Sequence, residues 1–89
     1  MNYNAPMVIG VEISLYPLAE QFAPEIHDFI ARLAAAADLK VVSSSLSTQV
    51  FGDYERVFET LRRELRATFE SRGEKGGKAA FVLKVLGPL

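Results

Sequence analysis

The stretch from Val8 to Tyr16 alternates strictly between two kinds of side chain, and this pattern limits the fold more than any other feature. Large aliphatic residues fall on one side of an extended chain, and a glycine with polar or aromatic residues falls on the other. The first set is Ile9, Val11, Ile13 and Leu15, and the second is Gly10, Glu12, Ser14 and Tyr16. We therefore predict a central strand over 8–16, ended by Pro17, with one core face and one face open to another use.

Two later segments follow helical spacing. The first is predicted to begin near Pro24 and to run to Ala37, where Asp38 ends it. The second begins after Asp53, a residue that suits a helix N-cap. The apolar stripe of the first helix is Ile26, Phe29, Ile30, Leu33 and Ala37, and that of the second is Tyr54, Val57, Phe58, Leu61, Leu65 and Phe69. Strands are predicted over 39–45, 48–52 and 79–86, with a hairpin turn at 45–47 and a flexible glycine-rich loop at 73–78.

The order strand, helix, strand, strand, helix, strand predicts one ferredoxin-like α+β domain over 1–89, with a loose lead-in at 1–7. We expect a four-stranded antiparallel sheet with two helices on one face. In our detailed arrangement the first strand is central, parallel to the third strand and antiparallel to the fourth. A register consistent with the hydrophobic pattern sets Glu12 opposite Lys84, so that core positions meet core positions. The open face then carries Glu12, Ser14, Tyr16, Val42, Ser44, Gln49, Phe51, Val82 and Lys84.

Composition excludes several classes of function. The chain has 89 residues, a formal net charge of −1 and no cysteine. Bulk charge gives no reason to expect nucleic acid or an anionic membrane as a partner, and disulfides and thiolate metal sites are ruled out. The first residues lack the pattern of a signal peptide, which favours a cytoplasmic protein. Hydrophobic residues make up 49% of this short chain, which favours self-association.

No group of residues in the sequence forms a catalytic constellation. His27 is the only histidine, and a position on the helix surface explains it better than a site does. The serines at 43, 44, 45 and 47 fit a turn better than a nucleophile, although they could hydrogen-bond a ligand. Glu12 has two interpretations: a cross-strand ion pair with Lys84, or a partner with Tyr16 for a cationic aromatic ligand. We expect no catalytic residue, no metal and no cofactor.

Three stretches together resemble the small thiamine-binding (YkoF-like) family. They are Glu12–Leu18 (EISLYPL), Ile26–Ile30 (IHDFI) and Leu46–Tyr54 (LSTQVFGDY), and the resemblance extends from about Val8 to Leu86. It implies a ferredoxin-like fold, no catalysis, assembly into homodimers or homotetramers through the sheets, and thiamine or hydroxymethylpyrimidine as ligand. The family's serine/threonine motif matches Ser47 and Thr48. Together with the strand faces, this gives the candidate ligand-binding residues Glu12, Ser14, Tyr16, Ser44, Ser47, Thr48 and Phe51.

The leading hypothesis is therefore a non-enzymatic binding protein for thiamine or its hydroxymethylpyrimidine moiety, active in vitamin supply or salvage. The alternative is a structural or regulatory homo-oligomerisation module whose open sheet face is buried by another subunit. Alternation places Thr48 on the opposite face from Gln49 and Phe51. A pocket on the open face and a pocket at the sheet–helix edge therefore both remain open.

Overall fold

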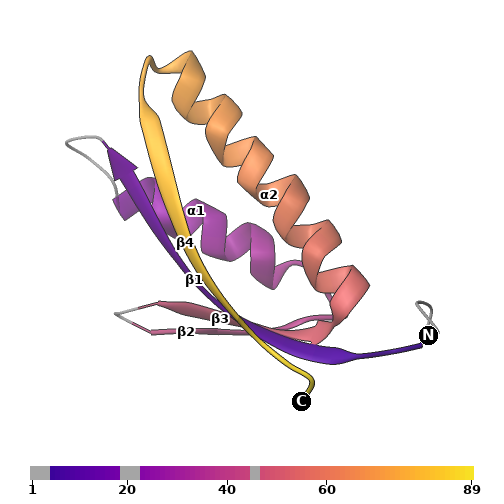
Figure 1. Ribbon diagram of the computed structural model, residues 1–89. Helices are drawn as coiled ribbons and strands as arrows, with labels where there is room; N and C mark the ends of the chain where they lie inside the picture. Colours follow the sequence, from indigo (N-terminus) through magenta and orange to yellow (C-terminus); the bar gives the residue numbers. More distant parts are fainter. Residues whose placement is uncertain (1–4, 19–22, 45–46) are drawn as a thin grey trace.

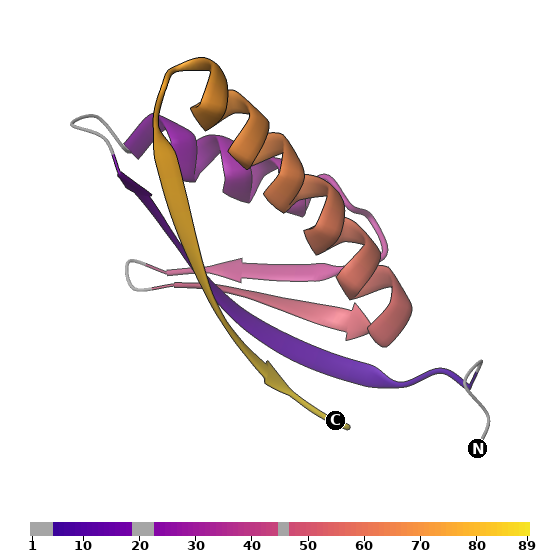
Figure 2. The same cartoon turned by 45° about the horizontal axis from the view of Figure 1, so that its top comes forward.

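The computed structural model describes residues 5–18, 23–44 and 47–89, which form four strands and two helices in the predicted order (Figure 1). The elements are β1 (Val8–Leu18), α1 (Ala23–Ala34), β2 (Lys40–Ser43), β3 (Thr48–Asp53), α2 (Tyr54–Glu74) and β4 (Lys78–Leu86). Both helices lie against the same side of a strongly twisted sheet (Figures 1 and 2). The predicted α+β sandwich is thus confirmed, and neither of the two described helices covers the other face of the sheet.

The strand order is β2-β3-β1-β4, and all three neighbouring pairs are antiparallel. The predicted register between β1 and β4 is confirmed along its length, with Glu12 opposite Lys84. The expectation that β1 runs parallel to β3 is wrong. The α1 crossover makes β1 and β2 parallel, and β3 returns by a hairpin between them, so it opposes both.

The strand β1 continues through Pro17 to Leu18, whereas the sequence predicted that the proline would end it. Among the described residues, β1 beyond Ile13 pairs with β4 alone, because the pairing with β3 covers Val8 to Ile13. A proline is tolerated where one side of the strand has no partner, since its missing N–H leaves no ladder bond unmade.

The core lies between the sheet and the helices, as the alternation in β1 predicted. Ile9, Val11, Ile13 and Leu15 are all buried. The partners that bury them are Phe29 and Leu33 of α1, Val50 of β3, and Val57 and Leu61 of α2. Burial of these aliphatic and aromatic side chains holds the helices to the sheet at about 1.5–3 kcal/mol for each fully buried side chain.

Helix α1 ends at Ala34, three residues before the predicted end at Ala37. The chain tightens there, because the Ala36 N–H donates to the Leu33 carbonyl and the Leu39 N–H donates to the Ala36 carbonyl. Bonds of this three-residue spacing are typical of a helix that is finishing. The strand β2 then begins at Lys40 and ends at Ser43, within the predicted 39–45. Ala37 is exposed and is not part of the apolar stripe.

The start of α2 agrees with the prediction that Asp53 caps it. The Asp53 carboxylate accepts a hydrogen bond of 3.2 Å from the Glu55 N–H. Its other oxygen accepts one of 3.2 Å from the Met7 N–H, and the Tyr54 N–H donates to the Met7 carbonyl at 2.7 Å. Met7, at the end of the expected lead-in, is therefore tied to the start of α2, and residues 1–4 lie outside the described residues.

The buried stripe of α2 is more polar than predicted. Val57 and Leu61 are buried, but Tyr54 and Phe69 at its two ends are exposed. The other buried positions are Thr60, Glu64, Thr68 and Arg72, spaced by four residues. Glu64, Thr68 and Arg72 of this row bond side chains of α1, so α2 has one apolar contact surface and one polar contact surface.

The turn between α2 and β4 is shorter than the loop predicted over 73–78. The helix includes Gly73 and Glu74, and the Lys75 and Gly77 N–H groups both donate to the Arg72 carbonyl. A Cβ atom on Gly77 would lie 2.4 Å from Nη2 of Arg72. Glycine at this position therefore allows the chain to pass close to a buried guanidinium.

Candidate functional site

A groove of about 550 Å³ lies on the open face of the sheet. Three strands contribute to it: β1 in the centre, β3 on one side and β4 on the other. Its lining residues are Gly10, Val11, Glu12, Gln49, Phe51, Lys84, Val85 and Leu86. The volume falls within the range of small-molecule sites, and a mainly apolar lining with a few polar groups is typical of them.

The Phe51 ring lies against the backbone of Gly10, its register partner on β1. A Cβ atom built on Gly10 would come within 2.9 Å of Phe51 Cε1 and 3.0 Å of Cδ1. Only a residue without a side chain leaves the ring in this position. The glycine in the alternating stretch therefore places an aromatic surface beside the groove floor.

Glu12 and Lys84 are the two charged residues in the groove lining. They stand directly opposite each other on β1 and β4, with 3.8 Å between Glu12 Oε1 and Lys84 Nζ. The predicted cross-strand ion pair is therefore present. The Glu12 side chain is 42% exposed and that of Lys84 is 81% exposed, so water screens the pair and its net contribution to stability is small.

Only part of the predicted ligand-binding set lies together. Glu12 and Phe51 line the groove. Ser14 and Tyr16 follow on the same face of β1, opposite Val82 and Ala80, and lie outside the groove lining.

The hydroxyl residues of the β2–β3 connection lie apart from the groove. The Ser44 N–H and hydroxyl both donate to the Ser47 carbonyl, at 2.9 and 3.1 Å. Thr48 is buried on the helix side of the sheet, and its hydroxyl lies 3.2 Å from that of Ser43. The hairpin predicted at 45–47 agrees with this arrangement, although Ser45 itself lies outside the described residues.

Gln49 and Lys84 line the groove but were not among the predicted ligand-binding residues. The predicted register between β1 and β4 had set Lys84 opposite Glu12, and alternation had set Gln49 on the open face. The structure adds that Gln49 is the other cross-strand neighbour of Glu12, through the antiparallel pairing of β1 with β3. Cross-strand adjacency to Glu12 was the signal for Lys84, and a place on the open face was the signal for Gln49.

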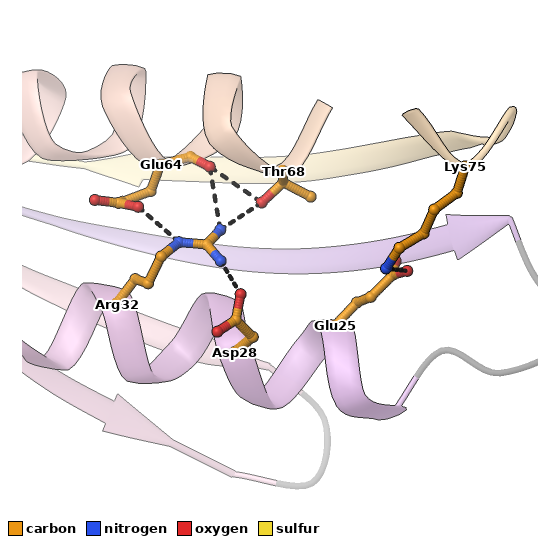
Figure 3. Close-up of polar contacts among 6 residues, drawn as sticks. All are labelled: Glu25, Asp28, Arg32, Glu64, Thr68 and Lys75. Carbon is orange, nitrogen blue, oxygen red and sulfur yellow. Dashed lines mark hydrogen bonds and ion pairs between the residues drawn. The ribbon is translucent and has the colours of Figure 1, made fainter. Parts of the chain in front are cut away.

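A second polar cluster joins the two helices and was not foreseen from the sequence. Arg32 of α1 donates to the Glu64 carboxylate at 2.7 Å and to the Thr68 hydroxyl at 2.7 Å, and it also bonds Asp28 (Figure 3). Arg63 donates to the other Glu64 oxygen at 2.9 Å. Burial works to raise the pKa of Glu64, but the hydrogen bonds from Arg63 and Arg32 outweigh it and hold that pKa below its ordinary value of 4.5.

Nearer the other end of this interface, Arg72 of α2 bonds the Glu25 carboxylate, and Lys75 lies 3.5 Å from the same oxygen. Figure 3 shows Lys75 reaching Glu25 across the gap between the helices. The cleft beside this interface holds only about 20 Å³, roughly the space of one water. The interhelical cluster is thus a structural contact that fixes how the helices face each other.

Other candidate chemistry is sparse in the described part of the chain. His27 is exposed on α1, as the surface interpretation predicted. No cluster of three or more His, Cys, Asp or Glu side chains suited to a metal ion occurs among the described residues. Neither described helix combines the length and hydropathy needed to cross a membrane.

Several solved structures share this fold at low sequence identity. A Thermotoga maritima protein assigned provisionally to thiamine biosynthesis or salvage has a TM-score of 0.67 and 18% identity, over 88% of this chain and 81% of that one. A Streptococcus pneumoniae protein has a TM-score of 0.69 and 13% identity, over 91% of this chain and 87% of that one. A domain of unknown function from Bacillus cereus has a TM-score of 0.69 and 13% identity, over 93% of this chain and 79% of that one. At these identities the likeness establishes the fold.

No curated protein matches the sequence. Residues 8–74 match the YKOF-related family, and this span includes β1, both helices, β2 and β3. The family match covers most of the chain and confirms the resemblance carried by its strand and helix segments: the chain belongs to the YKOF-related family.

Proposed function

We propose that this protein binds thiamine or its hydroxymethylpyrimidine moiety without catalysing a reaction, and serves vitamin supply or salvage in the cytoplasm. The observation that carries the proposal is the open-face groove, whose lining includes both the acidic Glu12 and the aromatic Phe51 in a YKOF-related chain. The provisional link of the Thermotoga maritima protein to thiamine supports the same ligand.

The chemistry of the groove suits a cationic heteroaromatic ligand. A carboxylate attracts the positive thiazolium ring, and an aromatic face adds a further attraction to a cation. Gln49 supplies an amide that can both donate to and accept from an aminopyrimidine. In this arrangement Glu12 recognises the charged thiazolium ring, and Gln49 recognises the neutral aminopyrimidine ring.

The other predicted ligand-binding residues have supporting positions in this proposal. Ser14 and Tyr16 extend the open face beyond the groove. Ser44 and Ser47 hold the turn at the start of β3, and buried Thr48 fixes the strand that carries Gln49 and Phe51.

Isothermal titration calorimetry with thiamine and with hydroxymethylpyrimidine tests this assignment. Glu12→Gln keeps the shape of the side chain and removes its charge, so it should weaken thiamine binding by about tenfold, the effect of a lost charge-assisted contact. Binding of the neutral pyrimidine should change much less. Glu70→Gln, on the exposed surface of α2, is the matched control and should alter neither.

Absence of binding at millimolar thiamine, with the protein folded by circular dichroism, would count decisively against the proposal. If Glu12→Gln weakened the binding of thiamine and of hydroxymethylpyrimidine equally, Glu12 would not be the residue that recognises the thiazolium ring. A raised melting temperature in the presence of ligand gives an independent readout, because a ligand that binds only the folded state stabilises it.

A second function is favoured by a different observation. Tyr16, Val42 and Val82 are large, exposed and on the open face, with Val82 53% exposed. A homo-oligomerisation module that buries this face in a homodimer or homotetramer would cover them. Sedimentation velocity at micromolar protein, with and without thiamine, separates the two: a stable oligomer that binds no ligand would favour the module.

A further inference from the structure

Lys84 is held loosely in the groove. Its Nζ lies 3.8 Å from Glu12 Oε1, beyond hydrogen-bonding distance, and its side chain is 81% exposed. Within the described residues, Glu12 is its one ion-pair partner. A lysine has a flexible four-carbon chain, so little free energy opposes its movement away from the acid.

We propose that Lys84 determines which charge form of a cationic ligand the groove prefers, an inference that rests on the proposed function. In the free protein its ammonium group stands next to the carboxylate that a ligand cation would occupy. Two positive charges beside one carboxylate repel each other, so a simple cation must displace Lys84. Displacement costs the free energy of the Glu12–Lys84 pair and leaves the ammonium group without a partner.

A ligand that carries both a cation and a phosphate ester changes this balance. Its cation takes the place of Lys84 at Glu12, and its phosphate gives the displaced ammonium group a new partner. The two charges of the groove are 3.8 Å apart on neighbouring strands, so one small ligand spans both. Lys84 therefore disfavours thiamine and favours thiamine monophosphate.

The test compares the dissociation constants of thiamine and thiamine monophosphate, measured by calorimetry at one ionic strength, in three proteins. Wild type should bind the phosphate ester more tightly. Lys84→Gln should bind thiamine about two- to fivefold more tightly, the range of an exposed ion pair. It should also lose the preference for the ester, so that the ratio of the two constants changes by about tenfold.

Lys78→Gln is the matched control. Lys78 lies on the same strand and, by alternation, on the same face, but it pairs with Leu18 and is outside the groove lining. It removes the same charge roughly 20 Å along the strand. Its ratio of dissociation constants should stay within about twofold of wild type, because water and salt screen a charge at that distance.

An unchanged ratio in Lys84→Gln, or the same change in Lys78→Gln, would overturn the inference. Failure of the proposed function has a different signature, since wild type then binds neither compound. In that case, thiamine binding gained only in Lys84→Gln would support the displacement of Lys84. No binding by any of the three folded proteins would reject both proposals.

Discussion

Replacing Arg32 by methionine should destabilise the protein through the interhelical cluster and not through the core. Arg32 donates to both Glu64 and Thr68 at 2.7 Å, and the Glu64 side chain is 9% exposed. Methionine keeps most of the aliphatic volume but removes every donor. The Glu64 carboxylate would then stay largely buried with Arg63 as its remaining ion-pair partner.

The expected loss is about 2 kcal/mol in the free energy of unfolding. Removing one member of a fully buried ion pair costs about 3–5 kcal/mol. Here the value is smaller, because Arg32 is 29% exposed and Arg63 continues to neutralise Glu64. A loss of this size lowers the melting temperature of a domain this small by about 10 °C.

Urea denaturation followed by far-ultraviolet circular dichroism measures this difference. Arg66→Met is the matched control, because Arg66 pairs with Glu70 on the exposed face of α2 and should contribute less than about 0.5 kcal/mol. A double-mutant cycle with Glu64→Gln isolates the Arg32–Glu64 coupling. The reasoning is refuted if Arg32→Met costs no more than Arg66→Met.

The same cluster predicts how stability depends on pH. Glu64 has a lower pKa in the folded protein than its ordinary 4.5, so its contribution is present above that value. This contribution is lost as the pH falls through the folded pKa. Wild type should therefore lose stability below about pH 4.5, and Glu64→Gln should lose less over the same interval. Parallel urea midpoints for the two proteins from pH 6 to pH 3 would contradict this.

Four further substitutions have expected effects on urea stability. Thr60→Val should stabilise by about 1 kcal/mol, because the buried Thr60 hydroxyl has no hydrogen-bond partner among the described residues. Gly77→Ala should lower the free energy of unfolding by about 1–3 kcal/mol, because the new Cβ would clash with the Arg72 guanidinium. Gly73→Ala should raise the free energy of unfolding by about 0.5–1 kcal/mol, because this helical position has open space for a Cβ. Gly10→Ala should lower the free energy of unfolding by about 1 kcal/mol and weaken thiamine binding, because the Phe51 ring must move. An unchanged affinity for thiamine would show that binding does not depend on the position of this ring.

The sheet was predictable because β1 and β4 both have a two-residue period. Matching their apolar positions brings core face to core face, and the register chosen on this basis sets Glu12 opposite Lys84, as the structure has it. The direction of β3 relative to β1 was predicted wrongly, although the hairpin and the α1 crossover together determine it. The groove itself depends on how the Phe51 ring settles on Gly10, a contact that alternation alone does not define.

The polar contact between the helices could not be predicted from hydrophobic periodicity. Glu64 and Arg72 belong to a row of polar residues, and such a row ordinarily indicates a solvent-exposed surface. Their partners Arg32 and Glu25 lie on the other helix, more than thirty residues away in sequence. Charge pairing at that separation becomes visible only when the two helices are placed side by side on the sheet.

The division of β1 into two faces separates folding from ligand choice. Ile9 to Leu15 on the inner face hold the helices, while Glu12 on the outer face stands in the groove. Substitutions at Gln49, Phe51 or Lys84 therefore change the lining without touching the core. A small combinatorial library confined to Glu12 and these three positions would sample new ligands on an intact scaffold, and natural selection has the same freedom.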